Sequence, residues 1–279
     1  MIDSILYGDC RETLKTVTNS SVQTCVTSPP YYGLRDYGGE KNQIGLEQTP
    51  EEYIDQLVQV FKEVHRVLKD DGTLWVNIGD SYYNYRSGKG QALPKQTVSK
   101  SNQDLPQVNP KRGNKLDGLK EKDLIGIPWM LAFALRKDGW YLRQDIIWHK
   151  PNPMPESVKN RCTKSHEYIF LFSKTKKYYF DHKGIMEDAT KQEGLRAKRS
   201  VWTQSADSAP SAEHFATYPQ GLIKPCVIAG SPKGGLVLDP FAGLGTTGIV
   251  AENLGRDSIM IELSKEYIRE MKKRITKHT

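Results

Sequence analysis

The tetrapeptide Ser28-Pro29-Pro30-Tyr31 carries groups that could act on a planar amino group. Its prolines fix φ and hold the Pro29 carbonyl rigidly, while Ser28 supplies a hydroxyl. Two such acceptors on the two hydrogens of an exocyclic amine favour a pyramidal nitrogen, whose lone pair can then attack an electrophile. Tyr31 could stack on the ring, a contact worth about 1–3 kcal/mol for a nucleobase. In isolation, an ordinary turn with an exposed tyrosine is the simpler interpretation.

A second segment, residues 239–248, reads Asp-Pro-Phe-Ala-Gly-Leu-Gly-Thr-Thr-Gly and lies between an apolar strand and a helix. Gly243, Gly245 and Gly248 match G-x-G-x-x-G, a pattern typical of nucleoside cofactor sites. Glu262 follows Gly243 by 19 residues (262 − 243), near the spacing of a carboxylate that binds ribose hydroxyls. An NAD site is therefore one interpretation, and a tight packing turn is another.

Three features favour S-adenosylmethionine over NAD. Asp239 ends the strand before the turn, where a carboxylate can pair with the methionine ammonium but would repel a pyrophosphate. Phe241 offers an apolar surface, and Thr246 and Thr247 offer hydroxyls at the helix start for a carboxylate. The segment after the turn is expected to form only one more strand and helix, fewer than a nicotinamide-binding half normally needs.

The charge distribution indicates a polyanionic partner. The formal net charge is +7 and the sequence pI is about 9.0. Lysines and arginines gather in two polar segments, residues 86–122 and 174–199, which raises the odds of phosphate contacts, although solvated loops explain any one such segment. The candidate phosphate-contacting residues are Lys111, Arg112, Lys176, Lys177, Arg196, Lys198 and Arg199.

Composition bounds the class of protein. Of the 279 residues, 37% are hydrophobic and 26% charged, as in soluble globular proteins. No apolar run reaches the roughly 20 residues of a membrane span, and the start lacks a secretory signal, so a cytoplasmic location is expected. The cysteines Cys10, Cys25, Cys162 and Cys226 are scattered, and the histidines lack metal-site spacing, so no metal is expected.

Apolar patterning predicts the elements that position these motifs. Strands are expected at residues 5–7, 22–27, 73–78, 141–148, 167–172, 236–238 and 256–261, with a hairpin strand at 178–180. Helices are expected at 11–17, from Pro50 to a stop at Gly72, at 127–135, 219–229 and 246–254, and after Ser264. The alternation predicts one parallel or mixed sheet with helices on both faces.

Together the two motifs resemble those of amino-group DNA methyltransferases, in the permuted group whose catalytic motif precedes the cofactor motif. The resemblance spans nearly the whole chain, including residues 8–10, 27–37, 75–80, 148–155, 164–167, 214–219 and 239–248. It implies a single catalytic domain over residues 1–279, with a Rossmann-like sheet of about seven mostly parallel strands. It also implies that a target base is flipped out of double-stranded DNA, which costs a few kcal/mol.

The resemblance further assigns site residues. Ser28, Pro29, Pro30 and Tyr31 are the catalytic motif, whose serine form is more typical of N4-cytosine than of N6-adenine enzymes. Residues 174–212 fall where the family has its target-recognition region, and residues 82–122 are an insertion beyond a minimal member. The expected S-adenosylmethionine-binding residues are Asp9, Thr27, Phe215, Thr217, Asp239, Phe241, Ala242, Gly243, Gly245, Thr246, Thr247 and Glu262.

Several alternatives stay open at this point. Adenine N6 is an alternative target, and a non-catalytic DNA-binding protein or an NAD-dependent oxidoreductase is an alternative class. Protein glutamine methylation ranks low because it usually places Asn before the prolines. C5-cytosine methylation needs a Pro-Cys turn, and Pro225-Cys226 falls inside a predicted helix. A cognate restriction endonuclease would fit the resemblance as a partner, whereas monomer and homodimer are both compatible with the sequence.

Overall fold

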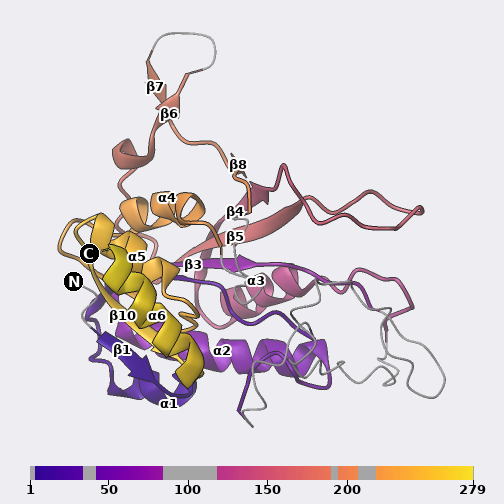
Figure 1. The fold of residues 1–279 in the computed structure, drawn as a ribbon, viewed down its shortest axis with the longest axis horizontal. Helices are drawn as coiled ribbons and strands as arrows, with labels where there is room; N and C mark the ends of the chain where they lie inside the picture. The colour runs from indigo at the N-terminus through magenta and orange to yellow at the C-terminus, as the bar shows by residue number, and fades with distance from the viewer. Residues whose placement is uncertain (1–3, 34–41, 84–117, 190–193, 207–217, 279) are drawn as a thin grey trace.

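The structure is a computed structural model that describes residues 4–33, 42–83, 118–189, 194–206 and 218–278. Eight strands form one sheet in the order β1-β10-β9-β2-β3-β5-β4-β8 (Figure 1). Neighbouring strands are parallel except at β5, which runs antiparallel to both β3 and β4. Their bounds are β1 (Ser4–Tyr7), β2 (Val22–Thr27), β3 (Leu68–Ile78), β4 (Tyr141–His149), β5 (His166–Ser173), β8 (Val201–Thr203), β9 (Leu236–Asp239) and β10 (Asp257–Glu262).

The centre of the sheet joins segments that are far apart in the sequence. Strand β2 is buried along its whole length and lies between β3 and β9. Cys25 pairs with Leu238 of β9 and with Leu74 of β3. Because these three strands are parallel, their carboxyl ends meet at one edge of the sheet, which we call the catalytic edge because the predicted catalytic motif follows β2 there.

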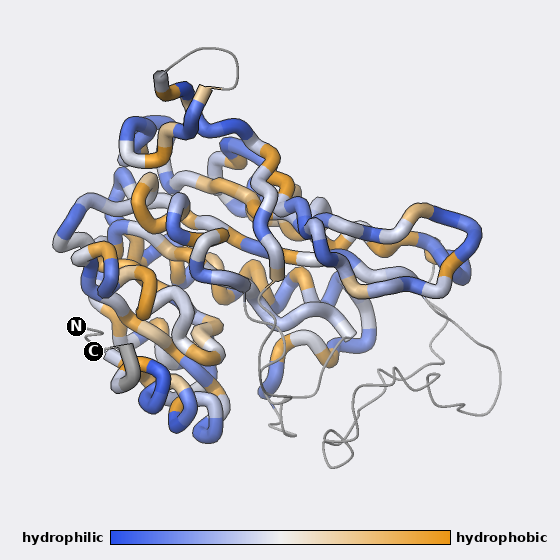
Figure 2. The backbone as a smooth tube through the Cα atoms, turned by 45° about the horizontal axis from the view of Figure 1, so that its top comes forward, coloured by the Kyte–Doolittle hydropathy of each residue, from blue (hydrophilic) through white to orange (hydrophobic). Residues whose placement is uncertain are grey.

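Helices cover both faces, as predicted. The helices α1 (Cys10–Thr13), α2 (Pro50–Val67) and α3 (Ile127–Lys137) pack into one apolar core, together with the 3-10 turn Leu14–Thr16. The helices α4 (Gln220–Gly230) and α5 (Thr246–Asn253) pack into a second core on the opposite face. Helix α6 (Lys265–His278) packs through Met271 against Met260. The apolar segments of the backbone therefore lie in the interior of the molecule (Figure 2).

Two sequence expectations are wrong. Helix α2 begins with the predicted Thr49 capping box but ends at Val67, because Leu68 is already extended and pairs with Val22 as the start of β3. Gly72 therefore lies inside a strand rather than ending a helix. Residues 178–180 form no strand, since the chain after β5 turns back and donates from Tyr179 N to the Asp71 carbonyl.

Three segments extend from this body. Residues 150–165 form a long loop between β4 and β5 that projects away from the sheet (Figure 1). The short hairpin of β6 (Glu187–Asp188) and β7 (Leu195–Arg196) projects in another direction, after the 3-10 turn Lys183–Ile185. The strand β8 that follows adds an eighth member to the sheet beside β4. Among the described residues, no helix is long and apolar enough to cross a membrane.

Candidate active site

The two motifs that the sequence singled out meet at the catalytic edge. Strand β2 ends at Thr27, next to Ser28, and β9 ends at Asp239, next to the glycine turn. The Thr27 hydroxyl donates to Asp239 Oδ1 at 2.6 Å. Residues more than two hundred positions apart in the chain are thus bonded directly, and Ser28 lies one residue from the contact.

Asp239 is the centre of a buried hydrogen-bond cluster. Besides Thr27, its carboxylate accepts from the Thr247 hydroxyl at 2.6 Å and from the Tyr218 hydroxyl at 3.0 Å. The Phe241 amide donates to it as well, at 3.0 Å. Burial raises the pKa of this carboxyl, although all these donors oppose the shift. Both carboxylate oxygens therefore have donors within the protein, and they tie the cofactor turn to the catalytic strand.

The glycine turn adopts the backbone that its sequence requires. Gly243 and Gly245 have φ of 52° and 76°, in the left-handed region that favours glycine, and α5 begins immediately afterwards. The Gly243 amide donates to Glu262 Oε2 at 2.8 Å, and the Ser264 amide donates to Oε1 at 2.7 Å. Burial raises the pKa of Glu262 to about 7. The carboxylate thus lies at the turn, as the spacing predicted.

Thr246 gives this edge an unsatisfied polar group. Its hydroxyl is buried and has no hydrogen-bond partner among the described residues. A buried hydroxyl at the start of a helix is suited to an anionic ligand, because the first amides of the helix also lack partners. The methionine carboxylate is the anion that the sequence predicts here. The neighbouring Phe241 is partly buried, whereas Ala242 is buried against Met271 of α6.

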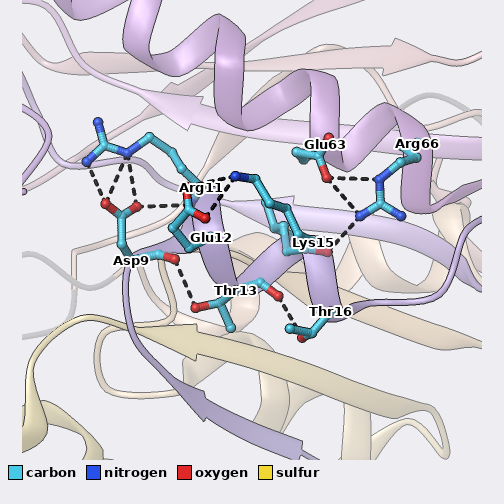
Figure 3. Close-up of polar contacts among 9 residues, drawn as sticks. Asp9, Arg11, Glu12, Thr13, Lys15, Thr16, Glu63 and Arg66 are labelled. Atoms are coloured by element: carbon cyan, nitrogen blue, oxygen red, sulfur yellow. Dashed lines mark hydrogen bonds and ion pairs between the residues drawn. The ribbon is translucent and has the colours of Figure 1, made fainter.

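Asp9 lies beside Glu262 at the same edge, because the Gly8 amide donates to the Glu262 carbonyl at 3.0 Å. Its side chain caps α1 and accepts hydrogen bonds from the Arg11 guanidinium (Figure 3). Burial opposes ionisation of Asp9, but the hydrogen bonds from Arg11 outweigh it and lower the carboxyl pKa. Arg11 also donates to the Asn42 carbonyl at 2.9 Å.

The Ser-Pro-Pro-Tyr turn is held by its neighbours. The Tyr53 hydroxyl of α2 donates to the Pro30 carbonyl at 2.7 Å. The Pro29 carbonyl accepts no hydrogen bond from any described residue, which leaves it available to a substrate donor. Gly79 lies under the Tyr31 ring, where an added Cβ would come within 2.7 Å of it.

A polar network that sequence reasoning missed fixes Tyr31. Its hydroxyl donates to Glu167 Oε2 at 2.6 Å and lies 3.4 Å from Asn77 Oδ1. Glu167 Oε1 is paired with Lys150, whose ammonium lies 4.1 Å from the centre of the Trp148 ring. Burial and the Glu167 charge raise the pKa of Tyr31 well above its ordinary value. The sequence signal that could have indicated this network is the pair of charged residues at the strand ends: Lys150 follows the strand 141–149, and Glu167 lies at the start of the strand 166–173.

A family model for DNA methylases of the N6/N4 methyltransferase type matches residues 22–273. The chain belongs to this DNA methylase family. The methylase is 49% identical over 272 residues to the Type II methyltransferase M.SmaI of Serratia marcescens, an alignment that covers 97% of this chain and 90% of that relative. The prediction of the family is confirmed.

Solved structures confirm the predicted fold. The PvuII DNA methyltransferase, named as cytosine-N4-specific, matches with a TM-score of 0.70 at 20% identity, covering 99% of the methylase and 90% of that chain. A DNA modification methylase of Thermus thermophilus, in complex with S-adenosyl-L-methionine, matches with a TM-score of 0.66 at 25% identity, covering 99% and 93%. That complex agrees with S-adenosylmethionine as the cofactor predicted for the methylase.

The predicted DNA-contacting residues of the methylase do not lie together. Arg196 and Arg199 both pair with Glu187, while the Lys198 ammonium lies 5.1 Å from the centre of the Trp202 ring. Lys176 and Lys177 follow the end of β5, at the edge of the sheet opposite Ser28, since Ser173 pairs with Thr73. Four predicted residues lie outside the described part of the chain: Lys111, Arg112, Phe215 and Thr217.

Cys226 of the methylase is a packed core residue, as the sequence indicated. It lies in the middle of α4 and is 1% exposed. Burial raises the pKa of its thiol, so the thiolate that C5 methylation requires is disfavoured there.

Proposed function

We propose that this methylase transfers a methyl group from S-adenosylmethionine to the N4 amino group of a cytosine that is flipped out of a specific sequence in duplex DNA. The observation that carries the proposal is the bond between Thr27 and Asp239, which puts the Ser-Pro-Pro-Tyr turn beside the cofactor turn. The serine at position 28 supports cytosine through the family resemblance, and the fold of the PvuII enzyme is compatible with it.

The cofactor fits the residues at the turn. Thr246 would hold the methionine carboxylate, and Glu262 would accept hydrogen bonds from the ribose hydroxyls. Asp9, next to the hydrogen bond between Gly8 and Glu262, would lie near the adenine. S-adenosylmethionine, when bound, supplies the electrophilic methyl group.

The protein's own part in the reaction is to orient the target amine. The Ser28 hydroxyl and the Pro29 carbonyl would accept its two hydrogens, so that the nitrogen lone pair points away from the ring plane. Tyr31 would stack on the base, and the prolines keep both acceptors in place before the base arrives. No covalent bond between enzyme and base is needed.

Weighing the modified nucleoside tests the proposal. DNA from a methylation-deficient host that expresses the chain is digested to nucleosides, and N4-methylcytosine is the expected product. N6-methyladenine would overturn the base assignment. The absence of any modified nucleoside would overturn the proposed function.

Ser28→Ala should lower methyl transfer at least about 100-fold while cofactor affinity persists, because one hydrogen bond to the amine in the transition state is lost. Full activity in that variant would refute the assigned site.

The remaining functional assignments belong to the same proposal. We assign target recognition to the part of residues 174–212 that follows Lys177, because Lys176 and Lys177 lie at the opposite edge of the sheet, and phosphate contacts to Arg196, Lys198 and Arg199. Because the substrate is cellular DNA, we place the enzyme in the cytoplasm. The Type II methyltransferase named among its relatives suggests a cognate restriction endonuclease as a partner. Methylome sequencing of the expressing host would give the recognition sequence.

A further inference from the structure

Residues 150–165, which we call the arm, leave the catalytic edge between β4 and β5. The two ends of the arm are joined by a hydrogen bond from the Lys150 amide to the Ser165 carbonyl, at 2.7 Å. Beyond this closure the described chain forms no helix or strand until His166, and it projects from the body in Figure 1. Lys150 at its base pairs with Glu167, which in turn binds Tyr31. The arm therefore starts beside the predicted base-binding residue.

The base of the arm is fixed to the body while its middle is exposed. Asn152 exchanges hydrogen bonds with the backbone of Ala206, at 3.1 and 3.3 Å. The Arg161 guanidinium lies 3.9 Å from the centre of the Tyr82 ring, and the Lys164 ammonium donates to the Asp80 carbonyl at 3.3 Å. The prolines that restrict the backbone of the first half are Pro151, Pro153 and Pro155. The arm is thus anchored at both sides and stiffened between them.

The charge of the arm is suited to a polyanion. It carries four cationic side chains and one carboxylate, a formal net charge of +3 (4 − 1). Glu156 pairs with Arg161, and Lys150 pairs with Glu167 outside the arm. Lys159 is exposed and has no carboxylate partner among the described residues. A phosphate backbone is the partner that such a segment fits in a DNA methylase.

Met154 gives the arm an exposed apolar side chain. It is 73% exposed, the largest fraction among the exposed large apolar side chains of the described residues. Val158, also on the arm, is 38% exposed. Proteins that distort duplex DNA insert side chains of this kind between base pairs, because an unstacked step offers an apolar space.

We propose that the arm enters the duplex at the target base pair and that Met154 fills the gap that the flipped base leaves in the stack, with Lys159 at the phosphates. The inference rests on the proposed function only in taking flipped duplex DNA as the substrate. Met154 lies four residues beyond Lys150, a reach of at most about 13–14 Å in extended chain. That reach exceeds the depth of either groove, roughly 8.5 Å for the major groove and 7.5 Å for the minor groove.

Single-turnover methylation of two duplexes tests the gap-filling role. Both carry the sequence found by methylome mapping, one with a paired target base and one with a mismatch opposite it. Met154→Ala should slow methylation of the paired target about tenfold and of the mismatched target much less, because a mismatched base costs less to flip. Met154→Leu should restore the rate. Tyr141→Ala, which removes an exposed apolar side chain at the opposite end of β4, should leave both rates unchanged. An unchanged rate for Met154→Ala, or an equal loss on both duplexes, would overturn the proposal.

The affinity for plasmid DNA separates this inference from the proposed function. Lys159→Glu should weaken binding and lower the slope of log affinity against log salt by about 1, whereas the exposed Lys69→Glu at the opposite edge should not. A chain that methylates no DNA would refute the proposed function, yet this comparison would still decide whether the arm meets DNA. Equal slopes for Lys159→Glu and the parent chain would refute the phosphate contact.

Discussion

The phenol of Tyr31, in the proposed catalytic motif, is held both at its ring and at its hydroxyl. Gly79 supports its ring, and Glu167 binds its hydroxyl at 2.6 Å. Glu167 forms an ion pair with Lys150 and accepts a hydrogen bond from Asn77 Nδ2 at 3.3 Å. The ring that is expected to stack on the target base is thereby fixed before the base arrives.

Removing the acceptor for Tyr31 should therefore lower turnover without weakening cofactor binding. We expect Glu167→Ala to reduce kcat about tenfold, because the ring loses its orientation, and Glu167→Gln to retain most activity since its amide oxygen still accepts. In a double-mutant cycle, Tyr31→Phe and Glu167→Ala should couple by about 1 kcal/mol. Glu63→Ala, which breaks a pair with Arg66 on α2, is the matched control. Strict additivity in the cycle would contradict the role.

Glu262 should make both stability and cofactor affinity depend on pH. Its pKa is raised from 4.5 to about 7 by burial, so between these values the folded protein binds more protons than the unfolded chain. Stability without cofactor must therefore fall as pH rises through this window, by up to roughly 3 kcal/mol. Affinity for S-adenosylmethionine should rise over the same window, because the ionised carboxylate is the better acceptor for ribose hydroxyls.

Urea unfolding and cofactor titration at pH 5.5 and pH 8 measure these two slopes. Glu262→Gln should flatten both, because the amide does not titrate. A parent chain and a Glu262→Gln variant with the same pH dependence would show that another group is responsible.

At the scale of elements, the insertion between β3 and α3 leaves the body through a closed neck, residues 80–83 and 122–127. The Tyr83 amide donates to the Asp123 carbonyl, and the Lys122 amide donates to the Tyr83 carbonyl, both at 2.8 Å. Asp80 caps α3 by accepting from the amides of Gly126 and Ile127, at 3.0 and 3.1 Å. The neck is thus held by bonds that do not involve residues 86–115.

Replacing residues 86–115 by a short Gly-Ser linker should consequently preserve the fold. We expect the free energy of unfolding in urea to change by less than about 1 kcal/mol, because the entropic cost of closing the connection at the neck varies only with the logarithm of its length. Asp80→Ala in the full chain should cost about 1–2 kcal/mol through the lost cap. The DNA affinity of the shortened chain also tests the contacts predicted for Lys111 and Arg112. Global unfolding of the shortened chain would mean that the neck does not close alone.

Elements with strong local signals were predictable, and those set by partners were not. Strand β2 was predicted to the residue because an apolar run ends at two prolines, and α2 began where its capping box required. Its end at Val67 was missed because pairing of Leu68 with Val22 overrides helical spacing. The Tyr31–Glu167 contact was likewise unpredictable, since it depends on β5 running antiparallel beside β3. The meeting of Thr27 with Asp239 followed from the resemblance, not from any local pattern.

At the scale of the whole molecule, the basic residues behind the net charge of +7 do not all lie on one side, because some are close to the catalytic edge and others are at the opposite edge of the sheet. The arm leaves that edge, and β8 ends there next to His149. Lys198 lies shortly before β8 and has no carboxylate partner among the described residues, unlike its neighbour Arg199, which pairs with Glu187. Lys177 lies at the opposite edge, after β5.

Charge reversal at two lysines should therefore have unequal effects on DNA binding, although each changes the net charge by the same amount. If phosphates contact the surface around β8, Lys198→Glu should lower the slope of log affinity against log salt by about 1 and weaken binding at low salt. Lys177→Glu should leave the slope unchanged, because at a distance beyond the Debye length of about 10 Å in 0.1 M salt its charge is screened. Titration of plasmid DNA at several salt concentrations measures both slopes. Equal slopes for the two variants would mean that net charge, rather than the position of each lysine relative to the catalytic edge, governs DNA binding.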